Sequence, residues 1–415
     1  MSRRNFILLI IVLIIITISA LLFFYFKQTP GGQGGEGDGG FFSNLNPFGS
    51  TETKPPAVET PTTPGTGEVI TIGEEERQLV KVSTMPIAGF AVFQKEKTEK
   101  EFVPALRYVA RTNGNVYQTF ADDVLEGKLS ETIIPKVYEA LFGNNGEMVI
   151  MRYLKSDEQT IQTFLGALPK EKLGGEVVGE RKVEGSFLPD NISDLSLSFD
   201  TTKIFYLLNT NDITSGIILN LKDNKKTQVF DSQFAEWLSF WPNIKMITLN
   251  TKPSGTIPGY MYAIDPAKKD FRRILSNING LTTLTSPDSK LILYSDNNLN
   301  LGIYHTDTRD SSSIGLRTLA EKCIWNKTSA DIYCAVPKSI QQGIYPDIWY
   351  KGEMSFFDEI WKINVENGVT TKIINPIDVI GGEEIDGIKL ALDNDENYLF
   401  FVNKKDSYLW KLKLK

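Results

Sequence analysis

The sequence predicts an all-β protein, a β-propeller of about seven four-stranded blades, preceded by a single N-terminal transmembrane helix and a disordered linker. Three observations lead to this prediction: an uncharged apolar run from Phe6 to Phe26, a Gly/Pro/Thr-rich tract after it, and short strand-like segments that recur through the rest of the chain. We therefore divide the 415 residues into a membrane anchor at 1–27, a flexible linker at 28–67 and a propeller at 68–415.

The apolar run is long enough to cross a bilayer, because a helix of this length at 1.5 Å rise per residue spans the ~30 Å hydrocarbon core. It ends in the bulky residues Phe23–Phe26, not in the small residues of a signal-peptide cleavage site, and no cysteine lies near its end to carry a lipid. Arg3 and Arg4 precede it and only Lys27 follows closely. The positive-inside rule then predicts a single-pass protein of the cytoplasmic (inner) membrane, with its C-terminal domain outside.

Composition separates the linker from the domain. The tract TETKPPAVETPTTPGTG near the end of the linker has too little apolar surface to offset the entropy of ordering it. The chain as a whole is 41% hydrophobic and 23% charged, which is ample for a buried core. A net charge of -7 and a pI near 5.2 argue against nucleic acid as a partner, because phosphate binding requires clustered Lys and Arg.

Past residue 68, runs rich in Val, Ile, Leu, Tyr and Phe alternate with Asn, Asp, Gly and Ser clusters, which is typical of strands and turns. The runs recur as units that begin 42 to 65 residues apart, close to the ~40 to 50 residues of a propeller blade. The last unit has only three evident strands, so we expect residues 78–83 to supply its fourth strand and close the ring. The first strands are expected near Gly89, Val137, Asp194, Trp237, Leu281, Cys323 and Ile388.

Four hairpins share one pattern. LTSPDSKLILYS at 284–295 places a Ser-Pro-Asp turn and a lysine before an apolar strand, and SFDTTKIFYL, IWNKTSADIYCA and LDNDENYLFFV vary it. In these residues the chain resembles TolB-like and WD-repeat-like β-propellers, although it lacks the Trp-Asp dipeptide of the latter. RYVARTNGNVYQTF and other segments also look like uncharacterised bacterial membrane-anchored propeller proteins. The resemblance covers most of residues 79–415 and implies an architecture without an assigned activity.

The two cysteines, Cys323 and Cys334, flank a predicted hairpin turn centred on Thr328 and Ser329. Symmetric placement about the turn brings them opposite one another, within disulfide range, and a compartment outside the cytoplasm permits oxidation. We favour this disulfide over two buried free thiols. A zinc site would need two more ligands, and the chain has one histidine.

No constellation for catalysis emerges. His305 is the only histidine, and a lone histidine without a nucleophile is more often a packing or surface residue than a base. Asp393 with Asp395, and Glu383 with Glu384, are possible glycosidase carboxylates or calcium ligands, but their place in turns fits ordinary turn chemistry better. No Gly-x-Ser-x-Gly elbow is present. We therefore predict no catalytic residue, no cofactor and no metal.

The most suggestive segment is 340–357, IQQGIYPDIWYKGEMSFF, predicted as an insertion between the second and third strands of the sixth blade. That connection lies on the propeller face where ligands commonly bind. Its aromatic content is typical of interface hot spots, whereas packing over the central channel or a neighbouring blade is the alternative. The candidate binding residues are Tyr345, Trp349, Tyr350, Phe356 and Phe357.

We therefore expect a binding or scaffold protein without catalytic activity, which recruits a protein or cell-envelope partner through one propeller face. The alternative is a carbohydrate-active hydrolase or lyase that uses carboxylates carried by the propeller. Ionisable groups that converge on the axis would favour the enzyme, and an exposed aromatic patch would favour the scaffold.

Overall fold

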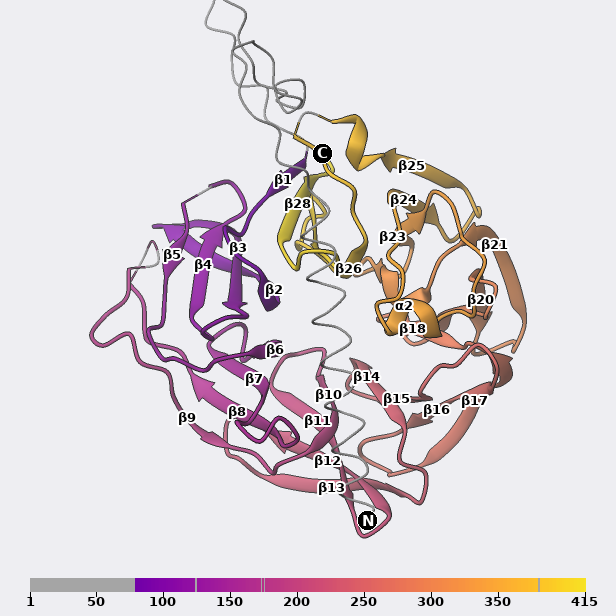
Figure 1. The fold of residues 1–415 in the computed structure, drawn as a ribbon, viewed down its shortest axis with the longest axis horizontal. Coiled ribbons are helices and arrows are strands. Elements are labelled where there is room, and N and C mark those ends of the chain that lie inside the picture. The colour runs from indigo at the N-terminus through magenta and orange to yellow at the C-terminus, as the bar shows by residue number, and fades with distance from the viewer. Residues whose placement is uncertain (1–78, 124, 173, 175, 380) are drawn as a thin grey trace, which may run out of the picture. The chain divides into compact units, whose positions relative to one another are not determined.

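The computed structural model describes residues 79–415 except 124, 173, 175 and 380. Seven four-stranded antiparallel sheets stand around a common axis, so this part of the chain is a seven-bladed propeller (Figure 1). The predicted all-β class and blade number are confirmed. We number the blades by the order of their innermost strands along the chain.

Blades 1 to 4 follow the chain directly, and each strand pairs with its neighbour in sequence. Blade 1 contains β2 (Ile87–Thr98), β3 (Glu101–Ala110), β4 (Val116–Phe120) and β5 (Gly127–Lys128), and blade 2 contains β6 (Val137–Gly143), β7 (Met148–Leu154), β8 (Ile161–Ala167) and β9 (Glu184–Phe187). Blade 3 contains β10 (Ile192–Leu197), β11 (Lys203–Thr210), β12 (Ile213–Asn220) and β13 (Lys226–Ser232), and blade 4 contains β14 (Trp237–Asn243), β15 (Met246–Thr251), β16 (Pro258–Ile264) and β17 (Phe271–Asn279).

Blades 5 and 6 continue this order, with short helices between some strands. Blade 5 contains β18 (Thr282–Thr285), β19 (Leu291–Ser295), β20 (Asn300–His305) and β21 (Ser311–Arg317), and the 3-10 helix η3 (Ala320–Lys322) leads from it to blade 6. Blade 6 contains β22 (Cys323–Trp325), β23 (Asp331–Pro337), the helix α2 (Asp347–Tyr350), β24 (Asp358–Asn364) and β25 (Thr370–Ile374), and the 3-10 helix η4 (Pro376–Asp378) follows.

Blade 7 joins the two ends of the described chain. Its strands are ordered β1-β28-β27-β26, so the outer strand β1 (Leu79–Lys81) completes a sheet whose other strands are C-terminal. Leu79 lies opposite Leu412, and Lys81 lies opposite Trp410. This pairing confirms the predicted closure of the ring. The C-terminal strands are β26 (Gly387–Leu392), β27 (Tyr398–Asn403) and β28 (Leu409–Lys413).

The predicted first strands are all present. Six of the predicted starts lie inside β2, β6, β10, β14, β22 and β26, and Leu281 lies one residue before β18. The spacing of the repeats predicted the positions of these first strands. One four-stranded blade cannot bury both of its faces alone, so each blade packs on the next and the pattern of buried strands recurs along the chain.

The shared hairpin pattern has a common backbone geometry. Thr201, Ser289, Ser329 and Glu396 all adopt a left-handed φ between 56° and 63°, at the residue where each turn bends back. In the best match, Ser286 Oγ donates to Asp288 Oδ1 (2.6 Å) and accepts from the N–H of Leu291 (3.1 Å). The Ser-x-Asp residues are therefore selected by turn chemistry, because their side chains satisfy backbone groups that the turn leaves free.

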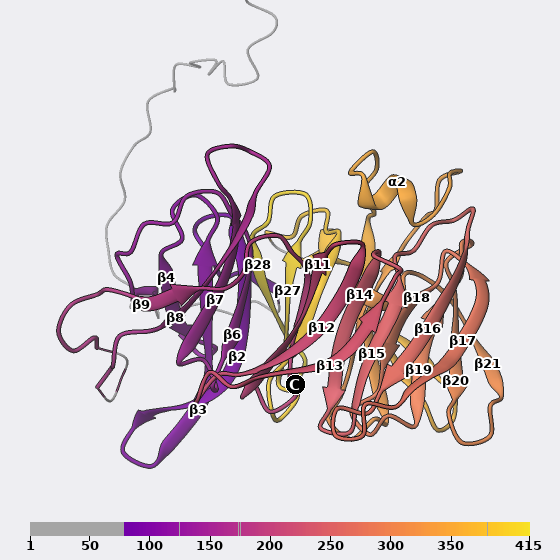
Figure 2. The same ribbon diagram turned by 90° about the horizontal axis from the view of Figure 1, so that it is seen from below.

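The ring has two different faces (Figure 2). One carries α2 and the connections between second and third strands, and we call it the insertion face. The opposite one carries the hairpin turns between first and second strands, and we call it the turn face. The C-terminus lies on the turn face, because the N–H of Leu414 donates to the carbonyl of Asn397 in the blade 7 hairpin turn (2.7 Å).

The core is divided among the seven blade interfaces, each of which has its own cluster of buried apolar side chains. Blades 1 and 2 approach most closely at Gly89, where any Cβ would collide with the carbonyl of Ala140. An eighth cluster lies under the insertion of blade 6. This last cluster has no counterpart in the other blades, which makes the insertion the feature that distinguishes this propeller.

The predicted disulfide is present. Cys323 in β22 and Cys334 in β23 are cross-strand partners with a Cα–Cα distance of 4.1 Å, and their sulfurs are bonded. Both are buried in the cluster between blades 5 and 6.

The predicted anchor at 1–27 and linker at 28–67 lie outside the described residues. Among the residues that are described, none belongs to a helix with the length and hydrophobicity to span a bilayer.

Candidate functional site

The insertion between β23 and β24 has the place that the sequence predicted. The N–H of Lys338 donates to the carbonyl of Phe357 (2.8 Å) and closes its base, while α2 projects from the insertion face (Figure 2). It is the only one of the described connections between second and third strands that contains an α-helix.

Three of the five candidate binding residues are buried. The rings of Tyr345 and Trp349 both stack on Phe356, with centroid distances of 5.7 and 6.1 Å, above Leu299 and Leu319. They therefore form the packed underside of the insertion, which was the alternative weighed for them. Of the five candidate rings, Tyr350 and Phe357 stay exposed, because the other three fill the space between the insertion and the blades.

The insertion is fastened to blade 4 through Asp347. Its carboxylate accepts hydrogen bonds from the N–H of Gly255 (2.6 Å) and from the Ser254 hydroxyl (3.1 Å), both in the connection between β15 and β16. Asn297 of blade 5 also donates to the carbonyl of Gly255 (3.0 Å). The segment that begins in blade 6 is thus tied across blade 5 to blade 4.

A buried charged triad lies beneath the insertion. Lys322, Asp358 and Asp386 are each fully excluded from solvent. The Lys322 ammonium lies 2.8 Å from Asp358 Oδ2 and also contacts Asp386 Oδ1. It sits over the rings of Trp349 and Phe356, 5.2 and 5.1 Å from their centroids. One ammonium therefore balances part of the charge of two carboxylates from different blades.

Asp386 connects the triad to the insertion. Its Oδ2 accepts from the Trp349 indole N–H (2.9 Å) and from the N–H of Phe356 (3.0 Å). Asp358 Oδ2 accepts from the N–H of Gly387 (2.7 Å), whereas its Oδ1 has no hydrogen-bond partner in the described part of the chain. Burial raises the pKa of Asp358 to about 6, against the opposing effect of the Lys322 charge.

Two more ionisable groups hold the insertion near its exposed edge. The Tyr350 hydroxyl bonds to Glu321, and Lys404 donates to the carbonyl of Trp349 (2.8 Å). Glu321 Oε1 is out of contact with solvent although the side chain as a whole is half-buried. Burial raises the pKa of Glu321 to about 7, opposed by the Tyr350 hydrogen bond and by the charges of Lys322 and Lys404. The pKa of Lys404 is lowered by burial.

The outer side of the insertion is partly apolar. Tyr350 and Phe357 are 38% and 37% exposed, and Ile344 is 52% exposed. Ile257 of blade 4 is also exposed. It lies in the connection between β15 and β16, which forms hydrogen bonds with Asp347. The Lys405 ammonium lies 3.7 Å from the centroid of the Phe357 ring. We call Ile257, Ile344, Tyr350 and Phe357 the insertion surface.

A second polar group belongs to the innermost strands. Glu139, Asp194 and Lys389 are each the third residue of their strand, counted from the insertion face, and each lies at a β-bulge. Arg152 is within 2.5 Å of Glu139. The charge of Glu139 acts on both other members, since it raises the pKa of Asp194 and opposes the fall in the pKa of Lys389.

The environments of Asp194 and Lys389 favour their neutral forms. Burial raises the pKa of Asp194, against hydrogen bonds from the Ser239 N–H and hydroxyl (2.6 Å each). Burial also lowers the pKa of Lys389, whose ammonium donates to the carbonyl of Ala88 (2.8 Å). Lys389 has a left-handed φ of 53°, which is unusual for a lysine inside a strand. Such paired shifts are common at functional sites and also occur in structural networks.

The other polar residues considered in the sequence have local roles. Asp393 Oδ1 accepts from the N–H of Tyr398 (2.6 Å) inside a hairpin turn, and Glu384 pairs with Lys405 (3.0 Å). His305 lies in β20, opposite Leu291. Among the described residues, no group of three or more His, Cys, Asp and Glu side chains is placed to hold a metal ion.

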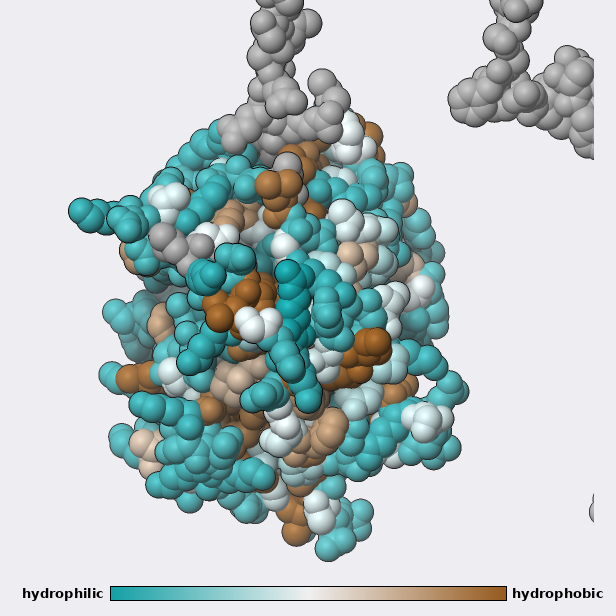
Figure 3. Space-filling view, turned by 90° about the vertical axis from the view of Figure 1, so that its left-hand side faces the viewer, coloured by the Kyte–Doolittle hydropathy of each residue, from teal (hydrophilic) through white to brown (hydrophobic). Residues whose placement is uncertain are grey.

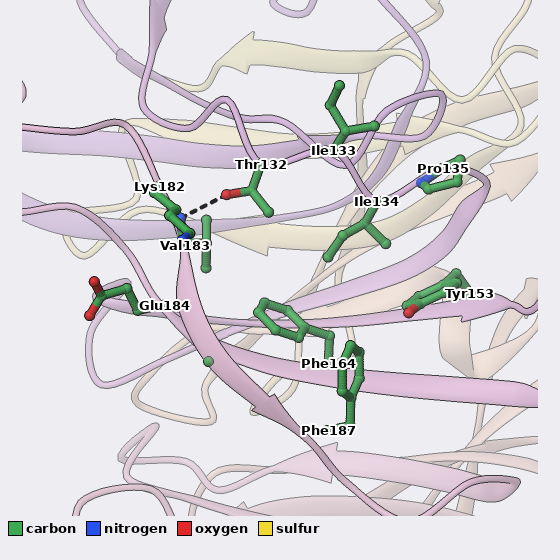
Figure 4. Close-up of a pocket in the computed structure, with 11 residues that line it drawn as sticks. Thr132, Ile133, Ile134, Pro135, Tyr153, Phe164, Lys182, Val183, Glu184 and Phe187 are labelled. Atoms are coloured by element: carbon green, nitrogen blue, oxygen red, sulfur yellow. Dashed lines mark hydrogen bonds between the residues drawn. The ribbon is translucent and has the colours of Figure 1, made fainter.

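A cavity of about 540 Å³ opens at the outer edge of blade 2, far along the chain from the insertion (Figure 4). The rings of Phe164 and Phe187 lie side by side in it at a centroid distance of 5.4 Å, and Ile134 lies across from them. Thr132 Oγ1 accepts from the N–H of Val183 at its rim (2.8 Å). On this side of the ring the hydrophobic residues form scattered patches in a hydrophilic surface (Figure 3).

Sequence reasoning did not find Lys322, Asp358 and Asp386. Each is a charged residue at or near the start of a strand, which is a usual place for an exposed charge. The three residues are 28 or more positions apart along the chain, and no local pattern signals their convergence. The unusual aromatic content of 340–357 was the only indication that something lies beneath it.

The described chain is thus a seven-bladed propeller with one strongly attached insertion. No family model and no curated protein sequence matches it. Among solved structures it is similar to an oligogalacturonate lyase from Vibrio parahaemolyticus, at 8% identity and a TM-score of 0.52 over 83% of this chain and 95% of that one.

Two further solved structures have lower scores. An oligogalacturonate lyase in complex with manganese has 9% identity and a TM-score of 0.47, over 82% of this chain and 98% of that one. A chain of the mitotic checkpoint complex has 10% identity and a TM-score of 0.48, over 87% and 99%. The similarity to the lyase from Vibrio parahaemolyticus, at 8% identity, supports the propeller fold alone, which many unrelated functions use.

Proposed function

We propose that this protein is a membrane-anchored binding module, which holds its propeller outside the cytoplasm and recruits a protein or cell-envelope partner through the insertion surface. The apolar run at 6–26 and the two arginines before it support the anchor and its orientation. The Cys323–Cys334 disulfide supports a non-reducing compartment, because cytosolic thiols are kept reduced.

The observation that carries the proposal is the contrast between the two sides of the insertion. Its underside is packed and hydrogen-bonded to blades 4, 6 and 7, whereas Ile344, Tyr350 and Phe357 stay exposed on its outer side. A surface held in this way loses little conformational entropy when a partner binds. Exposed aromatic rings on a rigid support are typical of binding hot spots.

The test is site-specific photo-crosslinking in intact cells that express the full chain. A photoreactive residue at Phe357 is expected to give a discrete cross-linked species, and Ile344→Ser in the same chain is expected to weaken it severalfold. Phe102, in the hairpin between β2 and β3, is 65% exposed and serves as the matched control position. Equal cross-linking from positions 357 and 102 would contradict the proposal.

A second candidate, a carbohydrate-active hydrolase or lyase, is supported by the polar group on the innermost strands. Asp194 with a raised pKa suits a general acid, and Lys389 with a lowered pKa suits a general base. Their common neighbour Glu139 is a further carboxylate for such a reaction.

This candidate predicts that the full chain cleaves an envelope polysaccharide and that Asp194→Asn and Lys389→Met each lower the rate by about 100-fold or more, as expected for loss of a general acid or base. The measurement is the appearance of new reducing ends or unsaturated ends. Asp190→Asn is the matched control, because Asp190 is exposed and forms a salt bridge with Lys155 in a neighbouring connection. Equal rates in the Asp194→Asn, Lys389→Met and Asp190→Asn variants would exclude a catalytic role for Asp194 and Lys389.

A further inference from the structure

Two neighbouring cavities open on the turn face, the smaller between blades 3 and 4 and the larger between blades 4 and 5, with Ile244 between them. Ile244 occupies the two-residue turn between β14 and β15, is 69% exposed, and lines both cavities. One has a volume of about 310 Å³ and the other of about 620 Å³. Basic side chains line each of them: Lys203 and Lys225 with Asp200 in the smaller, and Lys245, Lys268 and Arg272 with Asp265, Asp270 and Asp288 in the larger.

A second apolar tip stands beside Ile244. Phe199 lies in the hairpin turn between β10 and β11 of blade 3 and is 61% exposed. Phe199 and Ile244 are therefore at the tips of equivalent turns in adjacent blades. An exposed phenylalanine and an exposed isoleucine at two loop tips, surrounded by lysines, form a combination typical of proteins that lie on lipid surfaces.

Charge is segregated between the two faces of these blades. The turn-face segments 198–203, 221–226, 243–246 and 265–272 contain eight Lys or Arg and four Asp, a balance of +4. The connections of the same blades on the insertion face, 188–191, 211–212, 233–236 and 252–257, contain one Lys and three acidic residues, a balance of -2. A basic patch therefore stands out on a protein whose net charge is -7.

Three of the four aspartates of this patch, all except Asp270, form hydrogen bonds within their own turns. Asp265 Oδ1 accepts from the N–H groups of Ala267 and Lys268 (2.9 and 3.0 Å), and Asp223 Oδ1 accepts from the N–H of Lys225 (3.0 Å). Asp200 is likewise bonded to the Ser198 hydroxyl (2.6 Å). Among the described residues, the only salt bridge formed by a lysine of these segments is the long contact between Lys268 and Asp265, at 4.0 Å.

The described chain begins and ends on this same face. Leu79 lies opposite Leu412 near the end of β28, and the Lys415 ammonium donates to the carbonyl of Asp395 in the blade 7 hairpin turn (2.8 Å). The first described residue therefore lies at the turn face.

We propose that the turn face of blades 3 and 4 docks on an anionic phospholipid bilayer. Lipid phosphates enter the two cavities beside the basic side chains, while Ile244 and Phe199 reach the boundary of the acyl chains. The proposal rests on the membrane anchor proposed above, because a tether raises the local concentration of the bilayer and makes a weak surface sufficient. Docking in this orientation leaves the insertion surface, on the opposite face, turned toward a partner.

The test compares the full chain in nanodiscs of phosphatidylcholine with the full chain in nanodiscs of phosphatidylcholine and phosphatidylglycerol. Hydrogen exchange of segments 198–203 and 241–246 is expected to slow by about tenfold or more in the anionic discs at low salt, since each lysine near such a surface adds to the attraction. The protection is expected to disappear in high salt, because screening shortens the range of the interaction.

The double variant Ile244→Ser with Lys245→Glu is expected to abolish this protection. Its matched control is Ile213→Ser with Lys252→Glu, since Ile213 is 46% exposed and Lys252 is exposed, both on the opposite face. Equal exchange in the two kinds of disc, or protection that survives the Ile244 variant, would overturn the docking surface.

Failure of the anchor is recognised separately, because anchored protein co-purifies with discs of either composition. If the protein does not co-purify with the discs, the proposal of a membrane anchor is wrong. The docking surface is then tested by flotation of the full chain with phosphatidylglycerol vesicles. Flotation that is lost in the Ile244 variant supports the surface, and absence of flotation overturns it.

Discussion

Replacing Lys322 with methionine is expected to lower the free energy of unfolding by about 4 kcal/mol, because removal of one partner leaves buried charges without compensation. The ammonium is the cation that contacts both Asp358 and Asp386, and all three groups are fully excluded from solvent. Methionine matches the length of the lysine stem, so the loss is mainly electrostatic. Urea unfolding of the full chain, followed by the fluorescence of the propeller, measures the change.

The control for this variant is Lys136→Met. Lys136 pairs with Glu158 at 3.3 Å, and both side chains are mostly exposed, so this change is expected to cost less than about 1 kcal/mol. Adding Asp358→Asn to the Lys322 variant is expected to recover part of the stability, because it removes one of the two unbalanced charges while an amide oxygen can still accept from Gly387. A Lys322 variant as stable as the Lys136 variant would show that the triad is unimportant for folding.

Glu321→Gln is expected to stabilise the protein by about 3 kcal/mol at pH 8.5 and to have little effect at pH 4.5. Burial raises the pKa of Glu321 from 4.5 to about 7 in the folded protein. The folded state then binds the proton more tightly than the unfolded state does. The stability contributed by protonated Glu321 is therefore fully present below pH 4.5 and is lost as the pH rises through 7. Glutamine cannot ionise and keeps an oxygen that accepts from the Tyr350 hydroxyl.

Chemical unfolding at the two pH values measures this difference. Glu158→Gln is the matched control, because Glu158 is exposed, and it is expected to leave the pH dependence unchanged. Part of the wild-type dependence is expected to remain in the Glu321 variant, because Asp358, with its pKa raised to about 6, loses its contribution in the same way as the pH rises. An unchanged pH dependence in Glu321→Gln would mean that its carboxyl is hydrated in solution.

Most of the fold could be predicted because the strands of one blade, in blades 1 to 6, follow one another directly along the chain. The turns at Asp200 and Asp288 satisfy their own backbone groups, and the apolar strands that follow them recur at the spacing of one sheet. The closing strand was predictable from the number of strands in each unit, since the last unit lacked one strand and residues 78–83 had the pattern to supply it. The disulfide followed from the register of a single hairpin.

The insertion was located correctly, but the sequence did not show which of its rings are buried and which are exposed. Tyr345 and Phe357 are both aromatic residues in a polar loop, and nothing in their neighbours along the chain distinguishes them. Tyr345 is buried because Leu299 and Leu319, from blade 5 and the connection after it, happen to lie beneath it. Burial of a side chain depends on which distant segments reach it.

The sequence by itself determined the blade repeat, the hairpin turns and the paired cysteines, because each follows from hydrogen bonding and hydrophobic periodicity within a few tens of residues. It also determined the ring closure, because the last unit lacks one strand that residues 78–83 can supply. Only the tertiary structure decided that Lys322, Asp358 and Asp386 meet beneath the insertion, that Glu139, Asp194 and Lys389 share the inner strands, and that basic turns gather on one face. Electrostatic interactions act through space between blades, so the chemistry of a propeller face is set by the closure of the ring.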